Sequence, residues 1–453
     1  MNKTPDSSFT PSRRRFLLTA SGAAAFQIVP SHVVRAQDGQ QAPSDKLNIA
    51  FVGAAGRGSA NLGGCINENV YAFADCDQRH AAGTVQKHPK AKFYTDWREL
   101  LDKEGKNLDC VVVSTPDHNH AIVAMAAMQL GKHVYVEKPL TRTISEARAL
   151  MAAARKYKVV TQMGNQGHAA EGARQTNEWI QSGSLGEIRE VHCQSTRPIW
   201  PQDLVRPAKE EVPATLDWDI WLGPAPLADY SSQIAPFKWR GYLDYGTGAL
   251  GDMGAHIFDH PVWALDLGMP ETIEAKVERH TPGSEKVSHP ASCTITYQFA
   301  AKGNRPPVKL VWFDGKHRMP RPEKMDMDKN PPGDGCIYYG SKHVMMHGSH
   351  GGAPSLVNAA EAASFQAPPK TMERSPGHHA EWIAACKAGN PAGSKSNFDY
   401  AAPLTEIMLL GCIAAQVGDG TKLTWNAETL KTGNAEADAL VHHHYRDGWS
   451  LGS

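Results

Sequence analysis

A glycine-rich loop directly after an apolar strand is the feature that most limits how this chain folds. Residues 47–52 form the strand-like run, and Gly53-Ala54-Ala55-Gly56-Arg57-Gly58 follows it. The outer glycines allow a sharp turn and a close approach of strand and helix, whereas alanine holds the middle position of the G-x-G-x-x-G pattern. Amide groups at the start of the next helix then bind phosphate. The predicted contacts to a nucleotide pyrophosphate are Gly53, Ala55, Gly56, Arg57 and Gly58.

Strands and helices alternate regularly along the next hundred residues. Short β-branched runs are separated by stretches with helical spacing, including 98–103, 120–130 and 144–157. Such alternation predicts a parallel sheet with helices on both faces, that is, a Rossmann domain. We place this domain at residues 46–167, after a linker at 37–45. Its predicted strands are Asn48–Val52, Val70–Ala74, Cys110–Ser114, His133–Val136 and Val159–Met163.

An aspartate at the end of the second strand bears on the choice of nucleotide. Asp75 lies 22 residues after Gly53. A carboxylate at this distance accepts hydrogen bonds from the adenosine ribose and repels a 2′-phosphate, so it favours NAD over NADP. The alternative is an acidic residue that caps a turn or helix. Arg79 is close enough in sequence to accommodate a phosphate, so NADP stays possible.

The pattern changes beyond residue 167. Strand-like runs follow one another with few helices between them, which predicts a mostly antiparallel sheet in a second α/β domain, residues 168–453. A stretch rich in Pro, Gly, Met and Lys at about 317–352 predicts a long loop insertion. Helices are expected again at 380–388 and 403–417. The predicted strands are Ile188–Ser195, Ile273–Arg279, Cys293–Phe299 and Val308–Phe313.

A lysine follows the fourth strand in Tyr135-Val136-Glu137-Lys138-Pro139. Open α/β sheets bind their ligands at the carboxyl ends of the strands. A lysine at this place can orient a substrate hydroxyl, or lose its proton where water is excluded. By position alone, a solvated lysine is the commoner alternative.

A second group of polar residues has helical spacing. In a helix, Asp252, His256 and Asp259 share one face because they are four and three residues apart. A carboxylate one turn from an imidazole suits proton transfer. The same spacing also suits two ligands of a zinc site or an ion pair on the helix surface, and the spacing alone does not separate these three readings.

Together these motifs resemble the Gfo/Idh/MocA oxidoreductases over nearly the whole chain after residue 36. The matching pieces are the glycine loop, Ser114-Thr115-Pro116-Asp117-His118-Asn119-His120, Glu137-Lys138-Pro139 and Asp252-x-x-x-His256-x-x-Asp259. The resemblance implies a Rossmann domain followed by an α/β domain with a large, mostly antiparallel sheet. It also implies NAD(P)-dependent chemistry on sugars, polyols or cyclitols, and a homo-oligomer. A minority of the family cleaves glycosidic bonds with bound, recycled NAD.

The resemblance also implies roles for single residues. Lys138 corresponds to the lysine that hydrogen-bonds the reacting hydroxyl, His256 to the general acid/base, and Asp252 to the carboxylate that positions the sugar. It makes zinc a minor alternative, and we predict no metal site. The further residues expected to contact the cofactor are Thr115, Pro116, His120, Glu137 and Asn165.

Aromatic and basic residues cluster shortly before the Asp252 helix. Aromatic faces with adjacent hydrogen-bonding groups suit a sugar ring, and they also bury well at contacts between domains or subunits. We expect Trp239 and Arg240, with Asp259, to contact the substrate, and Trp218 and Trp221 to lie in the core or an interface. The tract His442-His443-His444 has no supporting ligands, and we expect a solvated helix end.

The N-terminus predicts export. Paired arginines in Ser12-Arg13-Arg14-Arg15-Phe16-Leu17-Leu18 precede an apolar run at 19–29 and the small-residue pattern Val34-Arg35-Ala36. The run is 11 residues long, too short to span a bilayer core of about 30 Å. These features favour a twin-arginine signal at residues 1–36, although general secretion is an alternative. The twin-arginine export machinery carries folded proteins, so the expected destination is the periplasm with a tightly bound cofactor.

Composition excludes several other classes of function. Lys and Arg total 47, as do Asp and Glu, so no basic surplus indicates nucleic acid. Eight scattered cysteines form no CxxC pair, and we expect no permanent membrane span. The predicted function is an exported NAD(P)-dependent oxidoreductase that transfers a hydride between nicotinamide and a sugar, polyol or cyclitol. The alternative is an NAD-dependent glycosidase or lyase that oxidises the sugar transiently before elimination.

Overall fold

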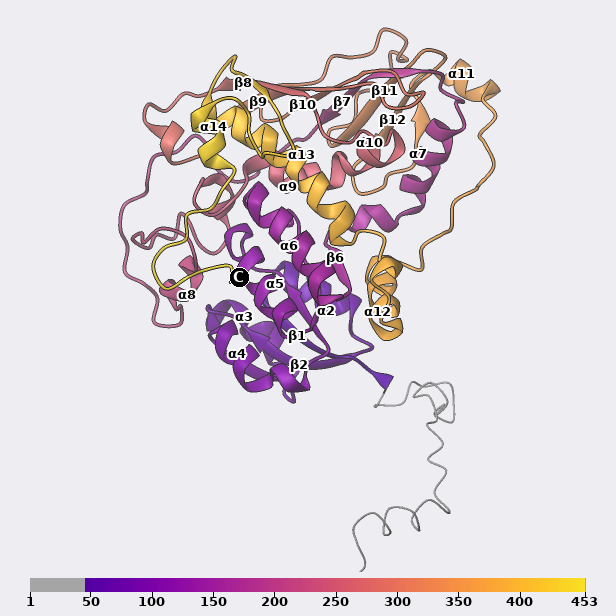
Figure 1. The fold of residues 1–453 in the computed structure, drawn as a ribbon. Helices are drawn as coiled ribbons and strands as arrows, with labels where there is room; N and C mark the ends of the chain where they lie inside the picture. The colour runs from indigo at the N-terminus through magenta and orange to yellow at the C-terminus, as the bar shows by residue number, and fades with distance from the viewer. Residues whose placement is uncertain (1–44, 453) are drawn as a thin grey trace, which may run out of the picture. The chain divides into compact units, whose positions relative to one another are not determined.

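A six-stranded parallel sheet organises the first part of the chain, in the order β3-β2-β1-β4-β5-β6 (Figure 1). The computed structural model describes residues 45–452, so the predicted export signal and most of the linker lie outside the described residues. The predicted Rossmann sheet is confirmed. Its strands are β1 (Asn48–Val52), β2 (Asn69–Ala74), β3 (Lys92–Tyr94), β4 (Cys110–Val113), β5 (His133–Val136) and β6 (Thr161–Met163).

Helices cover both faces of this sheet, which explains why its central strands are apolar throughout. Helices α4 to α6 share one hydrophobic core with one face, and α2, α3 and α12 share a second core with the other. The last of these comes from late in the chain, where Trp382 and Ala385 pack beside Phe51. The helices are α2 (Arg57–Gly64), α3 (Gln78–Val85), α4 (Trp97–Glu104), α5 (Asp117–Gln129), α6 (Ile144–Tyr157) and α12 (His378–Ala388).

An eight-stranded sheet forms the second layer, in the order β13-β12-β11-β7-β10-β9-β8-β14. Only β7 and β10 pair in parallel, so the predicted, mostly antiparallel sheet is confirmed. Its strands are β7 (Ile188–Gln194), β8 (Thr272–Glu278), β9 (Ser292–Phe299), β10 (Val308–Phe313), β11 (Gly335–Gly340), β12 (Val344–Gly348), β13 (Ser355–Leu356) and β14 (Lys422–Thr424).

The predicted loop insertion at 317–352 is wrong over its second half. Strands β11 and β12 form an antiparallel hairpin there, and β11 also pairs with β7. The apolar side chains of Ile337 and Val344 are buried beneath the residues around 319–325. Only the first part, up to about residue 334, lacks regular structure. The glycines and prolines that flank the hairpin are typical of loops, so the sequence did not indicate its two short strands.

Helices lie between the two sheets and join their cores (Figure 1). α13 packs against α6, α9 and β8, so a single apolar cluster runs from the parallel sheet to the antiparallel one. α13 is the one helix of the described residues that is long and apolar enough to cross a membrane, and 78% of its most apolar window is buried in the protein. The helices of this layer are α7 (Glu171–Gln181), α9 (Gly248–Ile257), α10 (Asp259–Ala264), α13 (Phe398–Val417) and α14 (Ala435–Leu440). A further helix, α11 (Ala359–Ser364), lies outside the layer, beside β13.

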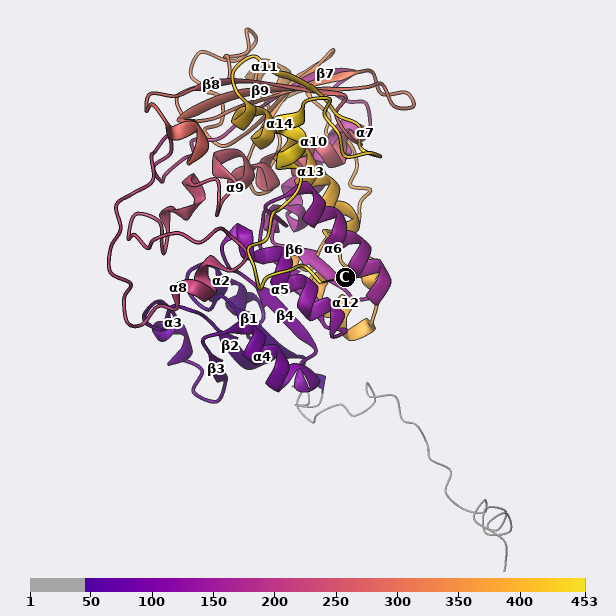
Figure 2. The same ribbon diagram turned by 60° about the vertical axis from the view of Figure 1, so that its left-hand side comes forward.

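After β7 the chain leaves the antiparallel sheet and returns to the Rossmann domain. We call residues 196–247 the covering segment. It includes α8 (Trp218–Leu222), which lies beside α3 in both views (Figures 1 and 2). Leu216 forms a β-bridge with Asp77, and the Trp221 carbonyl accepts a hydrogen bond of 3.0 Å from Asn119. The segment therefore covers the edge where β1 and β4 end.

Candidate active site

A cavity of about 360 Å³ lies between the carboxyl ends of the parallel strands and the covering segment. This is the crevice where the strand order reverses, the usual ligand position in such sheets. The lining from the Rossmann domain includes the predicted residues Gly53, Ala55, Gly56, Arg57, Asp75, Thr115, Pro116, His120, Glu137 and Lys138. The covering segment contributes Leu216, Ile220, Trp221, Ala235, Pro236, Phe237, Trp239 and Arg240.

The glycine loop has the geometry that a phosphate cradle requires. Gly53 has φ +86°, and a Cβ on Gly58 would lie only 1.8 Å from the Gly53 carbonyl oxygen. Gly56 has φ +52° and faces open space, because an added Cβ would have no atom within 4 Å. Helix α2 starts at the next residue, Arg57. Within residues 45–452 the amides of Gly56 and Arg57 find no hydrogen-bond acceptor, so they remain available to an anion.

Asp75 lines the cavity at the end of β2. Its two carboxylate oxygens accept hydrogen bonds from the amides of Ala54 (2.9 Å) and Asp77 (3.0 Å), which fix the side chain beside the glycine loop. Burial raises the pKa of Asp75. Each oxygen keeps a second lone pair for a ribose hydroxyl. Arg79, the residue that left NADP possible, is exposed and does not line the cavity.

Two polar groups that follow parallel strands have no protein partner within residues 45–452. The Thr115 hydroxyl is buried and has no hydrogen bond within the described residues. The Asn165 amide nitrogen is likewise unpartnered, and the Asn165 oxygen accepts a hydrogen bond of 2.6 Å from Ser396. Asn165 is fully buried and, unlike most of the other predicted cofactor contacts, does not line the cavity. His120 differs, because its ring nitrogens lie 2.8 Å from the carbonyls of Pro139 and Thr115. It joins the loops after β4 and β5.

Lys138 and Asp252 form a buried ion pair between the two layers. The Lys138 ammonium donates to the Asp252 carboxylate at 2.8 Å and to its carbonyl at 2.7 Å. The side chains are 14% and 12% exposed. Burial alone would raise the pKa of Asp252, but the Lys138, Arg240 and Arg197 cations outweigh burial and lower it. Asp252 therefore stays ionised and holds the lysine at the cavity wall.

His256 lies one helical turn beyond Asp252, as predicted for this helix. Its Nδ1 is buried without a hydrogen-bond partner in the described part of the chain. Burial, and secondly the Lys138 charge, lowers the pKa of His256 well below its ordinary value. The imidazole is therefore neutral at pH 7 and able to accept a proton.

Glu137 holds the glycine loop against the strand that carries the lysine. Its Oε1 accepts hydrogen bonds from Arg57 (2.9 Å), Asn61 (2.9 Å) and Gln166 (3.2 Å). Burial opposes ionisation, but the Arg57 charge and the Asn61 hydrogen bond lower the pKa of Glu137. The carboxylate is thus a positioning group that connects the Arg57 end of the cavity to Lys138.

Two sequence models match this chain. The NAD-binding Rossmann domain of the Gfo/Idh/MocA oxidoreductases matches residues 47–165, and the C-terminal alpha/beta domain of the same family matches residues 188–305. Together they cover more than half of the chain. The chain belongs to the Gfo/Idh/MocA oxidoreductase family. The predicted family is therefore confirmed, and NAD is confirmed as the cofactor of its first domain.

Individual relatives of this Gfo/Idh/MocA protein differ in their stated activities. Levoglucosan dehydrogenase of Pseudarthrobacter phenanthrenivorans is 28% identical over 41% of this chain and 40% of its own length. Alpha-N-acetylgalactosaminidase of Shewanella oneidensis is 29% identical over 39% of this chain and 44% of its own. The chain thus matches less than half the length of either relative.

Solved structures share the fold. An NAD-binding protein from Listeria innocua superposes with a TM-score of 0.59 at 15% identity, over 88% of this chain and 100% of the other. A levoglucosan dehydrogenase complex with NADH and levoglucosan gives 0.55 at 18% identity, over 84% and 99%. The residues present here fit NAD, since open amides, an anchored carboxylate and an unpaired Thr115 hydroxyl face one elongated crevice.

Asp259 does not lie beside Lys138, although Asp259 belongs to the family motif. A turn at Phe258 separates α9 from α10. The Asp259 carboxylate is 1% exposed and accepts hydrogen bonds from His168 (2.9 Å) and the Tyr400 hydroxyl (2.6 Å). Its oxygens are therefore used by protein groups that hold α10 against α13, and the predicted common face ends at His256.

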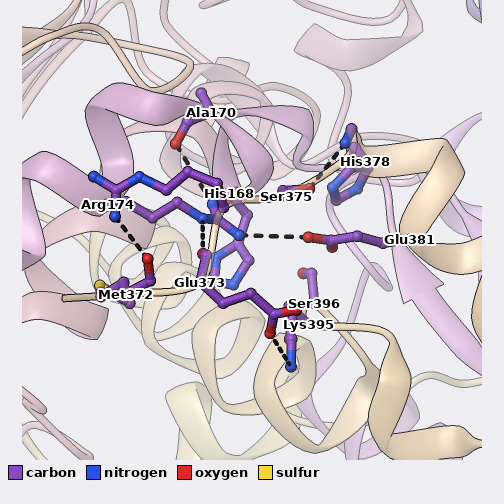
Figure 3. Close-up of polar contacts among 12 residues, drawn as sticks. His168, Ala170, Arg174, Met372, Glu373, Ser375, His378, Glu381, Lys395 and Ser396 are labelled. Carbon is purple, nitrogen blue, oxygen red and sulfur yellow. Dashed lines mark hydrogen bonds and ion pairs between the residues drawn. The ribbon is translucent and has the colours of Figure 1, made fainter. Parts of the chain in front are cut away.

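Arg174 fixes the segment behind His168 (Figure 3). Its Nε donates to the Glu373 carbonyl at 2.9 Å and its Nη1 to the His168 carbonyl at 2.6 Å. Its Nη2 forms an ion pair with Glu381 at 3.4 Å. This buried guanidinium connects α7 to α12 and to the turn at His168, and so fixes the position of the loop that bears Asn165.

Two residues near Asp252 and His256 were not indicated by the sequence. Arg197 lies 3.7 Å from the Asp252 carboxylate, and the only signal for it was its aromatic neighbours. His350 stacks on His256 with ring centroids 3.8 Å apart, and its φ of +58° is rare for a side-chain-bearing residue. No pattern in the sequence indicated this contact. Trp221, expected only in the core or an interface, is buried and also lines the cavity.

Proposed function

We propose that this protein is an exported NAD-dependent oxidoreductase that transfers a hydride between nicotinamide and a hydroxyl-bearing carbon of a sugar, polyol or cyclitol. The observation that carries the proposal is the Lys138–Asp252 pair at the wall of the nucleotide cavity, with the neutral His256 one turn away. The relative with the stated name levoglucosan dehydrogenase supports the substrate class. Oligomeric state stays a prediction.

The three residues divide the proton chemistry among them. Lys138 donates a hydrogen bond to the reacting hydroxyl oxygen and stabilises the negative charge that develops there. His256 accepts the hydroxyl proton as a neutral base. Asp252 holds the lysine ammonium in place at 2.8 Å. Bound NAD supplies the group that accepts the hydride, and the reverse sequence reduces a carbonyl.

The alternative is an NAD-dependent glycosidase or lyase. The covering segment favours it, because this segment is bonded to the Rossmann domain beside Asp77 and at Asn119 and so hinders release of the nucleotide. A retained cofactor has to be regenerated within each cycle, as in transient oxidation followed by elimination. The relative named alpha-N-acetylgalactosaminidase points in the same direction.

One assay separates the two activities. The purified protein is denatured to identify its nucleotide, and the native protein is offered sugars and aryl glycosides without added NAD. For a dehydrogenase we expect one equivalent of bound nucleotide to be reduced, with no bond cleavage. Release of aglycone without net change in the nucleotide would instead establish the glycosidase. If neither occurs and the protein contains no nucleotide, the proposal fails.

Export by the twin-arginine route is a separate part of the proposal, and it rests on the sequence of residues 1–36. Replacing Arg13 and Arg14 together by lysine keeps the charge but removes the paired arginines. We expect the wild type in the periplasmic fraction and the variant in the cytoplasm with its signal uncleaved. The matched control replaces Arg15 by lysine and leaves export intact. Equal export of the double variant would indicate general secretion.

A further inference from the structure

Asp252 is surrounded by more positive charge than it can neutralise. Lys138 contacts its Oδ1 at 2.8 Å, and the Arg240 Nε lies 3.3 Å from the same oxygen. The Arg197 Nε lies 3.7 Å from Oδ2. Three cations therefore share one carboxylate, and two of them, Lys138 and Arg240, line the cavity where the reacting hydroxyl is proposed to bind.

The two arginines have donors to spare. Each guanidinium carries five N–H groups, yet both side chains are only 26% exposed. The Arg197 Nε is buried and has no hydrogen-bond partner within residues 45–452. Asp252 is the only ion-pair partner of either arginine in the described part of the chain. Burying a guanidinium N–H group costs free energy unless a hydrogen-bond acceptor reaches it.

Aromatic rings fix the orientation of Arg240. Its guanidinium lies 4.1 Å from the ring of Trp239 and 5.7 Å from those of Trp200 and Phe237. Stacking of this kind covers the planar faces of the group and leaves its edges for hydrogen bonds. A rigid fork with free edges is the arrangement that binds a carboxylate or another oxyanion with two parallel hydrogen bonds.

Among residues 45–452, no other carboxylate forms an ion pair with either arginine. Glu137 is paired with Arg57 at 2.9 Å. Asp117 accepts hydrogen bonds from the Thr247 amide and hydroxyl. Burial raises the pKa of Asp117 and outweighs the charges of His120 and Arg240, which lower it. Asp334 accepts hydrogen bonds from groups just after β7. The missing negative charge is therefore expected from the ligand.

We infer that the substrate is an acidic sugar, whose oxyanion binds Arg197 and Arg240 while its reacting hydroxyl contacts Lys138. This inference rests on the proposed function and deepens it. The shared chemistry is an oxyanion attached to a sugar ring: the carboxylate of a uronic acid, or a sulfate or phosphate ester. Arg240 and Lys138 line the same cavity, so both groups of one substrate can be reached together.

The test measures binding separately from turnover. Calorimetric titrations use the nucleotide-loaded His256→Asn variant, with D-glucuronate against D-glucose and D-galacturonate against D-galactose. Glucose 6-sulfate, glucose 6-phosphate and inorganic sulfate distinguish the oxyanions. In at least one matched pair we expect the acid to bind more tightly. Arg197→Gln or Arg240→Gln should weaken that binding by about 10- to 150-fold, the range for hydrogen bonds to charged groups, and leave the neutral sugar unchanged.

Two further variants keep the test decisive. Arg206→Gln removes an arginine of the same covering segment that pairs with Asp244, and it should leave every affinity unchanged. Arg240→Lys keeps the charge without the fork and should recover part of the binding if Arg240→Gln folds poorly. Three outcomes would overturn the inference. Neutral sugars could bind as tightly as their acids, the preference for the acid could survive both glutamine variants, or every acidic probe and sulfate could fail to bind.

The inference and the proposed function fail in different ways. Tight, arginine-dependent binding of an acidic sugar that neither reduces the bound nucleotide nor loses an aglycone in the wild type supports the inference and contradicts the proposed function. Nucleotide reduction by neutral sugars alone, unchanged in the Arg197 and Arg240 variants, supports the proposed function and overturns the inference.

Discussion

Replacement of Lys138 by methionine or of His256 by asparagine is expected to reduce turnover by about 100- to 10,000-fold, the usual contribution of a positioned acid or base. Methionine retains the length of the lysine side chain but cannot donate to the reacting oxygen. Asparagine keeps a polar group in the buried site but cannot accept the proton. Either variant should still bind NAD, because the glycine loop and Asp75, which are proposed to hold the nucleotide, are unchanged.

The measurement combines steady-state kinetics on the sugar found active in the panel with the nucleotide content after denaturation. Lys309→Met is the matched control, since Lys309 lies on β10, pairs with Glu190 of β7 and is 41% exposed. It should retain wild-type kcat. The kcat of a further variant, Asp252→Asn, should lie between that of the Lys309 control and those of the Lys138 and His256 variants. Lys138 keeps the backbone carbonyl of residue 252 as a partner at 2.7 Å in this variant. Wild-type turnover in the Lys138 or His256 variant would refute the assigned roles.

The Rossmann domain could be predicted because its sequence carries strong local signals. The central strands are apolar throughout, since helices bury both faces, and the glycine loop marks the first turn. Lys138 could be predicted from its place at a strand end. The short edge strand β3 was missed because its residues, Lys92–Tyr94, are not buried and show no apolar run.

Contacts between distant segments were much harder to predict. Helix α13 was expected to begin at Pro403, a residue that favours a first turn, but Asn397 caps it six residues earlier by accepting from the amides of Asp399 and Tyr400. The expected solvated end at 442–444 is also wrong for His443, which is buried against Glu146 at 2.8 Å. Tertiary packing decided the second case, whereas the first depends on a local N-cap.

The same limit applies to the candidate site. Asp252 and His256 are adjacent on one helix, so their spacing revealed them. Arg197 and His350 reach the site from the ends of β7 and β12, which lie more than 150 residues apart in the sequence. Their approach depends on how the second sheet is folded. A single sequence contains no local pattern for such a meeting, and the charge excess around Asp252 becomes visible only when the layers are assembled.

Acidification below pH 6.5 is expected to destabilise the protein steeply, because four buried histidines are held neutral. Burial lowers the pKa of His118, His260 and His378 to about 3 and that of His289 to about 4. Unfolding restores an ordinary pKa of about 6.5. Between pH 6.5 and 4 the unfolded chain therefore binds more protons, so stability is full above this range and falls as pH decreases.

The size of the effect follows from proton linkage. Each histidine contributes up to about 1.4 kcal/mol per pH unit, so four together approach about 5 kcal/mol per unit below pH 6. Asp314 acts in the opposite direction, because burial raises its pKa to about 7 and the folded chain then holds a proton that the unfolded chain releases above about pH 3.9. It offsets about one histidine and leaves about 4 kcal/mol per unit, and burial also raises the pKa of Asp75 and of Asp117. The pKa of Glu146 is lowered to about 2, since the hydrogen bond and charge of His443 outweigh burial, and the stability it provides is lost only below its unfolded value of about 4.3.

Urea unfolding at pH 7.5, 6.5 and 5.5 measures this dependence. His289→Gln is the informative variant, because glutamine can still donate to the Gly246 carbonyl, 3.0 Å from the imidazole Nε2, but does not titrate. It should reduce the slope of the unfolding free energy against pH by about one proton, or about 1.4 kcal/mol per unit. The exposed His444 provides the control, and His444→Gln should leave the slope unchanged. A wild-type stability that is constant from pH 7.5 to 5.5 would show that water reaches these imidazoles and that they titrate normally in the folded protein.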